Sequence, residues 1–239
     1  MGIFDFDLIP QLELLKLRHN EIRLIEDQSF YNLTNLKQIK LDNNKLEFWR
    51  REWFVNTTAL EVMHFQFNKI KTIPKRAFVG FGKLRVIFFD NNDISEIQPD
   101  AFKEIRSLEY LGLGHNKLTV LEDYSFPNTL RIRAFVISGN YLNYLSNAVL
   151  KKLAAVEMVM DYNPWKCPCL ERIYYWLYIK NGKIKIPDNC IGNNVPVCAA
   201  PSGFSDSCVD TVDSELTQRY LSTLKNISPA VDQNCFRLE

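Results

Sequence analysis

Apolar and polar positions recur in one fixed pattern along the first two thirds of the chain. In LEYLGLGHNKL, residues 108–118, leucine occupies the first, fourth, sixth and last positions and asparagine the ninth. The short alternation of apolar and variable residues predicts a strand with one face inward and the other outward. The copies align on seven asparagines, five of whose six steps are 24 residues and the last 23: Asn20, Asn44, Asn68, Asn92, Asn116, Asn140 and Asn163. A period of this length predicts a solenoid in which each copy is one coil.

The asparagine marks the point where each coil turns away from its strand. Backbone polar groups buried in such a turn need hydrogen-bond partners, and a side-chain amide offers both donors and an acceptor. We therefore expect stacked asparagines that bond the backbone of their own and of neighbouring coils. A second apolar column with the same 24-residue spacing should fill the back of the coils: Phe6, Phe30, Phe54, Phe78, Phe102, Phe126 and Leu150.

The chain divides near Asn163 into two parts with different chemistry. Residues 1–163 hold about seven repeats, and residues 164–239 form a cysteine-rich C-terminal cap. Phe6 belongs to the back of a coil whose front half is absent, so the N-terminal cap is missing and the sequence reads as a fragment of a longer protein. The alternative is that residues 3–10, IFDFDLIP, serve as the cap.

The cap begins where the repeats end. Pro164 ends the repeat pattern. Trp165 replaces the repeat leucine and is expected to lie over the end of the core. A short amphipathic helix that closes the solenoid is predicted from the helical spacing of Leu170, Ile173, Trp176 and Leu177.

Two motifs together resemble a known family. L-x-x-L-x-L-x-x-N-x-L is the leucine-rich repeat pattern, and N-P-W-x-C-x-C at residues 163–169 resembles the C-terminal cap of animal extracellular leucine-rich repeat proteins. Toll-like receptor ectodomains, Slit proteins, variable lymphocyte receptors and insect leucine-rich repeat immune proteins are similar to it. The resemblance implies an α/β solenoid, a horseshoe with a parallel concave sheet and a disulfide-bonded helical cap. It also implies that the first cysteine pairs with the third and the second with the fourth.

This chain departs from the family pattern because its cap holds six cysteines and not four. The third pair would tie down a further helix at residues 214–227, SELTQRYLSTLKNI. Other connectivities stay open, and zinc is an alternative, although C-P-C is tighter than the usual ligand spacing and no histidine lies in the cap. We expect no metal, no cofactor and these pairs: Cys167–Cys190, Cys169–Cys208 and Cys198–Cys235.

Disulfides indicate an oxidising compartment. Three N-glycosylation sequons, at Asn32, Asn56 and Asn226, agree with it, and the first two share one repeat position on the back of the coil. No apolar run is long enough for a membrane helix. The chain is therefore expected to be secreted, or to be the extracellular part of a cell-surface protein.

The outward positions of the strands form columns that a partner could contact. In the first two repeats the outward residues are basic, and Lys37 is one of them. In the middle repeats they are aromatic and apolar, which is typical of an interface. Gly112, Gly114 and Gly139 should leave a hollow beside the aromatic residues. We expect Phe88 and Tyr110 to anchor the partner and the basic residues to steer its acidic region. The predicted partner-binding residues are Lys16, Arg18, Lys40, His64, Phe67, Phe88, Asp90, Tyr110 and Val136. The alternative is that Phe67 and Phe88 are ordinary aromatic residues of a sheet surface.

Catalysis is not expected, because the chain has no nucleophile, metalloprotease or nucleotide-binding motif. The three histidines, His19, His64 and His115, lie in different repeats and are expected to be solvated. A net charge of +1 gives no general attraction to nucleic acid. The resemblance implies a recognition module of innate immunity that binds a protein ligand or co-receptor and can form a homo- or heterodimer. Two alternatives remain: a self-associating adhesion or matrix scaffold, and a direct binder of a microbial glycan or lipid.

Overall fold

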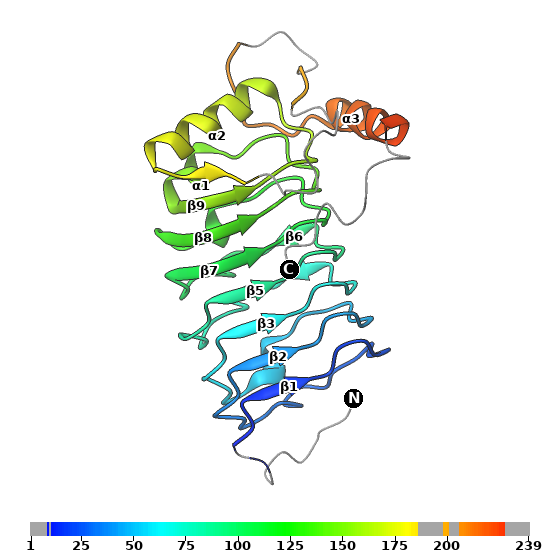
Figure 1. Cartoon of the computed structure of the whole chain (residues 1–239), viewed down its shortest axis with the longest axis vertical. Helices are drawn as coiled ribbons and strands as arrows, with labels where there is room; N and C mark the ends of the chain where they lie inside the picture. The colour runs from blue at the N-terminus through cyan, green and yellow to red at the C-terminus, as the bar shows by residue number, and fades with distance from the viewer. Residues whose placement is uncertain (1–8, 10, 186–197, 201–205, 228–239) are drawn as a thin grey trace.

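The computed structural model shows coils stacked in one direction, with a long parallel sheet along one side (Figure 1). It describes residues 9, 11–185, 198–200 and 206–227, without the side chains of Val156 and residues 225–227. The strands, in their order across the sheet, are β1 (Leu14–Lys16), β2 (Gln38–Lys40), β3 (Val62–His64), β5 (Val86–Phe88), β7 (Ser107–Gly112), β8 (Leu130–Val136), β9 (Leu153–Val159) and β10 (Lys183–Ile184). Neighbours pair in parallel, so the predicted solenoid with its parallel sheet is confirmed.

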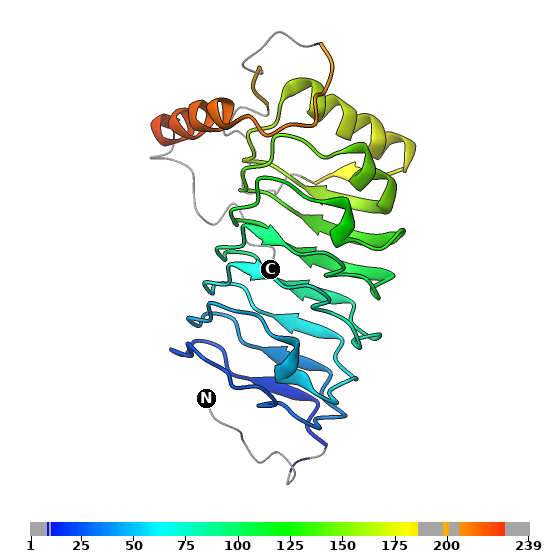
Figure 2. The ribbon, with the colours of Figure 1, turned by 180° about the vertical axis from the view of Figure 1, so that it is seen from behind.

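The return segments of the coils are mostly irregular (Figure 2). They include a second parallel pair, β4 (Thr72–Ile73) with β6 (Glu96–Ile97), and two short 3-10 helices, η1 (Arg51–Phe54) and η2 (Asp123–Ser125). Helix α1 (Asn147–Lys152) leads directly into β9. Its N-cap is Ser146, whose hydroxyl oxygen accepts a hydrogen bond from Val149 N at 3.2 Å.

The asparagine ladder is present as predicted, and Asn92 shows its geometry. Its Nδ2 donates to Phe89 O of its own coil at 3.0 Å and to Phe65 O of the preceding coil at 2.9 Å. Its Oδ1 accepts from Ile70 N at 3.0 Å. Equivalent bonds hold Asn44, Asn68, Asn116, Asn140 and Asn163. Each amide therefore joins two coils through their backbones.

The residue before each ladder asparagine has a left-handed backbone, with φ between 53° and 63° at His19, Asn43, Phe67, Asn91, His115, Gly139 and Tyr162. This conformation suits glycine and asparagine and costs other residues about 1–2 kcal/mol. The turn that sends each asparagine inward imposes it at every repeat. Phe67 and Tyr162 accept the conformation despite their size, which the sequence pattern did not predict.

The phenylalanine column is buried, as expected. Its described members are 0 to 4% exposed: Phe30, Phe54, Phe78, Phe102, Phe126 and Leu150. Phe6 lies outside the described residues. Trp49, which is not part of the 24-residue register, also joins the column, with ring centroids 5.3 Å from Phe54 and 5.7 Å from Phe78.

Charges of alternating sign follow the starting edge of the strands. In strand register the residues are Glu13, Lys37, Glu61, Arg85 and Glu109. Lys37 Nζ lies 2.7 Å from Glu13 Oε1, and Arg85 bridges Glu61 at 3.1 Å and Glu109 at 2.7 Å. Each exposed pair contributes little by itself, but every charge in this row has neighbours of opposite sign. We call this row the charge ladder.

Helix α2 (Cys167–Ile179) connects β9 to β10 and closes the core with Leu170, Ile173 and Leu177, as predicted. Trp165 is 1% exposed, and its Nε1 donates to Met160 O at 2.8 Å, so it covers the end of the core as expected. Helix α3 (Ser214–Ile227) coincides with the predicted second cap helix.

Two disulfides link the cap. Cys169 pairs with Cys208, as predicted, but Cys167 pairs with Cys198. Cys190 and Cys235 lie outside the described residues. Two predicted pairs are therefore wrong: Cys167–Cys190 and Cys198–Cys235.

The backbone explains why Cys198 is the partner of Cys167. Ala199 N donates to Trp165 O at 2.8 Å, and Ala199 O accepts from Cys167 N at 3.1 Å. This short parallel bridge, formed between Lys166 and Ala199, holds the two cysteines with their Cα atoms 5.0 Å apart. Sequence spacing gave no sign of the bridge.

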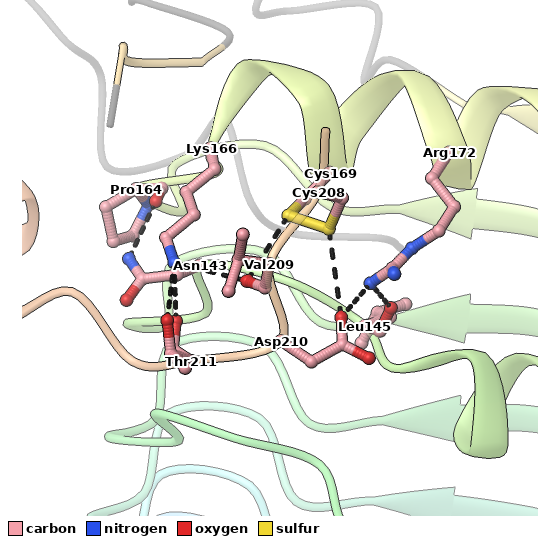
Figure 3. The surroundings of a disulfide bond; sticks show 10 residues. All are labelled: Asn143, Leu145, Pro164, Lys166, Cys169, Arg172, Cys208, Val209, Asp210 and Thr211. Atoms are coloured by element: carbon pink, nitrogen blue, oxygen red, sulfur yellow. Dashed lines mark hydrogen bonds and ion pairs between the residues drawn. A yellow bond between two sulfur atoms is a disulfide. The ribbon is translucent and has the colours of Figure 1, made fainter. Parts of the chain in front are cut away.

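Buried polar side chains anchor the cap around the second disulfide (Figure 3). Lys166 is 5% exposed, and its ammonium donates to Thr211 O at 2.7 Å and to Val209 O at 3.2 Å. Asn143 donates to Pro164 O at 2.8 Å and accepts from Asp213 N at 2.7 Å. A buried ammonium is tolerated only when hydrogen bonds replace its water, so these contacts fix the segment before α3 against the last coils.

Candidate functional site

The sheet face is the outward surface of the large sheet, including the residues between each strand and its ladder asparagine. Strand register aligns Lys16, Lys40, His64 and Phe88 in one row, which continues through Gly112 and Val136. All nine predicted partner-binding residues belong to this surface by register, and their environments differ.

Three aromatic rings stack across neighbouring strands at the centre of this face. The ring centroid of Phe88 lies 4.6 Å from that of His64 and 4.5 Å from that of Tyr110. Tyr110 is not opposite Phe88, because Gly112 holds that register position. The missing side chain at Gly112 lets Tyr110 lean across to Phe88. The structure thus brings the two predicted anchors together.

The expected glycine hollow is filled by neighbouring side chains. A β-carbon at position 112 would lie 2.7 Å from Asp90 Cγ, and one at position 139 would lie 2.6 Å from His115 Cε1. Gly114 N donates to Asp90 Oδ1 at 2.9 Å. The glycines therefore make room for Asp90, Tyr110 and His115, and the prediction of an open hollow is wrong.

The carboxyl group of Asp90 has a shifted pKa. Burial raises the pKa of its carboxyl group to about 7, although the hydrogen bond from Gly114 N acts in the opposite direction. The Asp90 charge also contributes to the raised pKa of Tyr110, for which burial is the larger cause. This carboxyl group is therefore near half ionisation at neutral pH.

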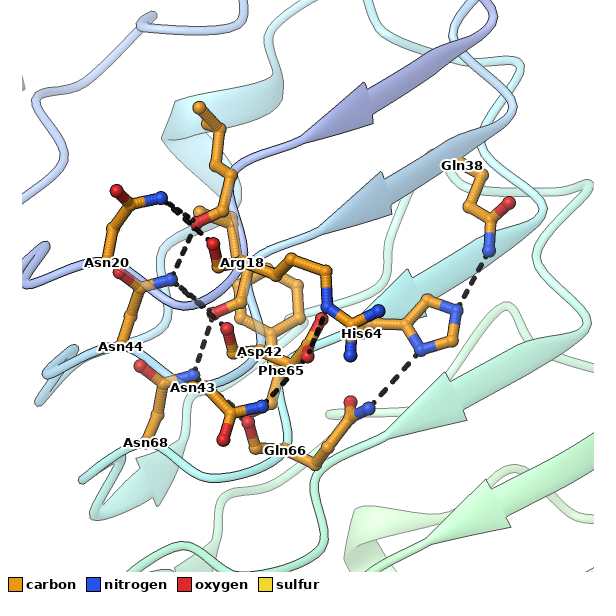
Figure 4. A network of polar contacts seen from close by, with 12 residues as sticks. Arg18, Asn20, Gln38, Asp42, Asn43, Asn44, His64, Phe65, Gln66 and Asn68 are labelled. Atoms are coloured by element: carbon orange, nitrogen blue, oxygen red, sulfur yellow. Dashed lines mark hydrogen bonds and ion pairs between the residues drawn. The ribbon is translucent and has the colours of Figure 1, made fainter. Parts of the chain in front are cut away.

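His64 and His115 are not the solvated histidines that we expected. Burial lowers the pKa of each to about 4, and Lys40 lowers that of His64 further. The ring of His64 lies 2.9 Å from Gln38 Nε2 and 3.4 Å from Gln66 Nε2 (Figure 4). Both imidazoles are consequently neutral at physiological pH.

The basic end of the face carries less free charge than predicted. Arg18 pairs with the buried carboxylate of Asp42 at 3.2 Å (Figure 4), and Lys37 belongs to the charge ladder. Lys16 is exposed and Lys40 is half-buried. Two of the predicted steering residues, Lys16 and Lys40, thus remain without an ion pair among the described residues.

Phe67 and Val136 differ in accessibility. Phe67 is 38% exposed and can contact a partner, whereas Val136 is 6% exposed and packs within the surface. Asp161 and Tyr162, which the prediction left out, extend the face beyond β9, and the charge of Asp161 reaches Tyr174 of α2 and the buried Tyr220 of α3. The repeat columns pointed to Asp161 and Tyr162, but only the folded cap brings Tyr174 and Tyr220 close to Asp161.

The first two sequons lie on the back of the coils. Asn32 and Asn56 are exposed and adjacent, and Asn56 Nδ2 donates to Asn32 Oδ1 at 2.5 Å. Both have positive φ, as does Gly80 at the same repeat position. The turn by itself thus favours asparagine here, and glycosylation of either residue stays a prediction. The side chain of Asn226 lies outside the described residues.

Neither a metal site nor a membrane span is found in the described ranges. No three His, Cys, Asp or Glu side chains converge there as metal ligands would. No helix within those ranges combines the length and the apolar composition that crossing a bilayer requires.

Two family models match the sequence. The model of the BspA type leucine rich repeat region matches residues 4–133 in six copies, which is more than half of the chain. The chain is a leucine-rich repeat protein. A second leucine rich repeat model matches residues 106–164 of this leucine-rich repeat protein.

Comparison with the curated proteins finds no match for the leucine-rich repeat protein. Among solved structures 258 chains match, so the fold is widely shared. One is in a crystal structure of a TLR13–ssRNA13 complex, with 21% identity and a TM-score of 0.51. The alignment covers 65% of the leucine-rich repeat protein and 26% of that chain. At this identity the likeness establishes the fold alone.

Proposed function

We propose that this chain is an extracellular recognition module that binds another protein through the sheet face, in innate immunity. The observation that carries the proposal is the ring stack of His64, Phe88 and Tyr110 on an outward surface, with Phe67 exposed on the same face. Aromatic residues dominate the energetics of protein interfaces. Rings already held against one another lose little conformational freedom when a partner binds.

The disulfides support an extracellular location. Cys167–Cys198 and Cys169–Cys208 both lie in the cap, and such bonds persist in oxidising compartments. The role in immunity rests on the N-P-W-x-C-x-C motif at residues 163–169, which resembles the cap of extracellular leucine-rich repeat receptors.

A protein suits this face better than the RNA of the solved TLR13 complex. Asp90 and Asp161 lie on it without a basic partner among the described residues, and the net charge of the chain is only +1. Nucleic-acid binding rests on neutralising many phosphates with Lys and Arg, whereas unpaired carboxylates repel phosphates.

The test uses the oxidised protein as bait for extracellular proteins of its source organism. The test variant is Phe88→Glu, and the matched control is Phe48→Glu, an aromatic residue that is 57% exposed and lies outside the strands. Circular dichroism establishes that both variants fold. We expect a protein ligand that the wild type and Phe48→Glu retain, and that Phe88→Glu binds at least about tenfold more weakly.

Other outcomes would contradict the proposal. Equal affinity of the ligand for Phe88→Glu and Phe48→Glu would move the binding surface away from the sheet face. Retention of further copies of this chain alone would favour the self-associating scaffold. Capture of a microbial glycan or lipid in place of a protein would favour the third alternative.

A further inference from the structure

Two carboxylates of the sheet face, Asp90 and Asp161, have no basic partner within the described residues. Both precede a ladder asparagine by two positions. In the same column Arg18 and Asp42 neutralise each other at 3.2 Å. Asp90 follows β5 and Asp161 follows β9, with β7 and β8 between them in the sheet. Three strand spacings separate the two carboxylates by about 14 Å.

Both groups are partly buried, without a compensating charge in the described part of the chain. Burial raises the pKa of Asp90 to about 7 and that of Asp161 above its usual value. A desolvated carboxylate without a counter-ion is unfavourable when ionised. An incoming basic side chain would remove that penalty and would restore the ionised form.

Asp90 has an aromatic neighbour, and Asp161 lies within electrostatic range of two tyrosines. Gly114 N orients Asp90 by a hydrogen bond of 2.9 Å, and Tyr110 converges with Asp90 over Gly112. Near Asp161 lie Tyr174 and Tyr220, both of which its charge affects. A guanidinium or ammonium group is attracted by ring faces as well as by carboxylates. Each carboxylate thus has the chemistry of a site for a basic side chain.

The surface between the two carboxylates carries only short side chains in their column, namely those of Gly114 and Ser138. No long side chain of that column stands between Asp90 and Asp161. An extended segment can therefore cross β7 and β8 and reach both groups.

We infer that the protein partner presents an extended basic segment whose two basic side chains, four residues apart, pair with Asp90 and Asp161. This inference rests on the proposed function and specifies the partner's chemistry. Residues i and i+4 of an extended chain lie on one face and about 13 Å apart. Lys16 and Lys40 repel such a segment from β1 and β2, so it lies over the strands from β5 to β9.

The test uses capped peptides in which two arginines are separated by one, three or seven Ser/Thr residues. Binding to the oxidised protein is followed by NMR titration at low ionic strength. The variants are Asp90→Asn, which keeps the acceptor for Gly114 N, and Asp161→Asn. The control is Asp27→Asn, a substitution in a loose, exposed pair with Arg50 at 3.6 Å. A peptide with glutamates in place of the arginines controls for charge.

We expect the peptide with three intervening residues to bind most tightly. Asp90→Asn and Asp161→Asn should each lower the affinity for this peptide by roughly tenfold, and Asp27→Asn should leave it unchanged. The inference is overturned if no peptide binds saturably in the millimolar range. It is also overturned if spacing has no effect, or if the two Asn variants bind as the wild type does.

The captured ligand separates this inference from the proposed function. If Phe88→Glu loses the ligand while Asp90→Asn and Asp161→Asn retain it, the sheet face remains the binding surface and the basic segment is rejected. If none of the three variants affects the ligand, both proposals fail.

Discussion

The carboxyl group of Asp90 folds into the space that Gly112 leaves open on the neighbouring strand. A β-carbon at position 112 would lie 2.7 Å from Asp90 Cγ and equally close to Tyr110 Cε1. One absent side chain thus positions both the carboxylate and the ring that flanks it. The contact between Phe88 and Tyr110 and the position of the Asp90 carboxyl group depend on the same glycine.

Gly112→Ala should therefore destabilise the protein by about 1–3 kcal/mol, because Asp90 and Tyr110 must both move. Gly112→Ala should also lower the affinity for the protein ligand whose binding Phe88→Glu weakens. The control is Gly82→Ala, where no atom lies within 4 Å of the added carbon. Urea unfolding of both variants measures the effect. Equal midpoints would show that the space beside Asp90 is not filled as described.

The raised pKa of Asp90 has a defined consequence for stability. Between pH 4 and about 7 the folded chain holds a proton that the unfolded chain has released. The contribution of Asp90 to the free energy of unfolding therefore falls as pH rises through this range. His64 and His115, with pKa values lowered to about 4, change stability in the opposite direction.

Asp90→Asn separates the effect of Asp90 on stability from that of His64 and His115. Near pH 4 the variant should match the wild type, because the carboxyl group is protonated. As pH rises to 7, the variant should become more stable than the wild type, by on the order of 1–3 kcal/mol. Urea unfolding at intervals across this range gives the difference, and a difference independent of pH would contradict the assigned burial.

The asparagine ladder predicts unequal effects of the same substitution at two repeats. Asn92→Ala leaves the buried Ile70 N without its amide acceptor and removes one of the two amide donors of Phe65 O and of Phe89 O, so it should cost about 2 kcal/mol or more. Asn20→Ala removes only exposed bonds to Leu17 O and Arg18 O and should cost under about 1 kcal/mol. Urea unfolding compares the two, and similar costs would count against the ladder as the source of stability.

The contact between Asn56 and Asn32 predicts competition for glycosylation. Their amides lie 2.5 Å apart on adjacent coils, so a glycan on one occupies the space beside the other. Protein secreted by eukaryotic cells should carry one glycan across the two sequons. Glycopeptide mass spectrometry measures the occupancy, and full occupancy of both sequons would refute this prediction. Asn32→Gly, which suits the positive φ, should keep the fold and leave Asn56 fully occupied.

The repeat register predicted those features that depend on one position recurring in every coil. The asparagine ladder and the phenylalanine column are of this kind, because each member meets the same environment. The outward position of Phe88 and Tyr110 was predicted from the same register, because alternation along a strand fixes which side chains point outward.

Features that depend on a side chain leaning across coils were not predicted. Asp90 fills the space at Gly112, and Trp49 enters the phenylalanine column from outside its register. The error at Cys167 has a similar origin, because its partner is set by the backbone bridge at Ala199 and not by sequence spacing. Register identifies rows of residues, and contacts between rows require the folded chain.

The charge ladder restricts how this solenoid can gain or lose length. From Glu13 to Glu109 the sign of the charge reverses at every coil. Duplication or deletion of a single repeat within that stretch would place two carboxylates or two cations side by side. Duplication or deletion of two repeats would preserve the alternation. Recombination that keeps the alternation of charge therefore adds or removes repeats two at a time.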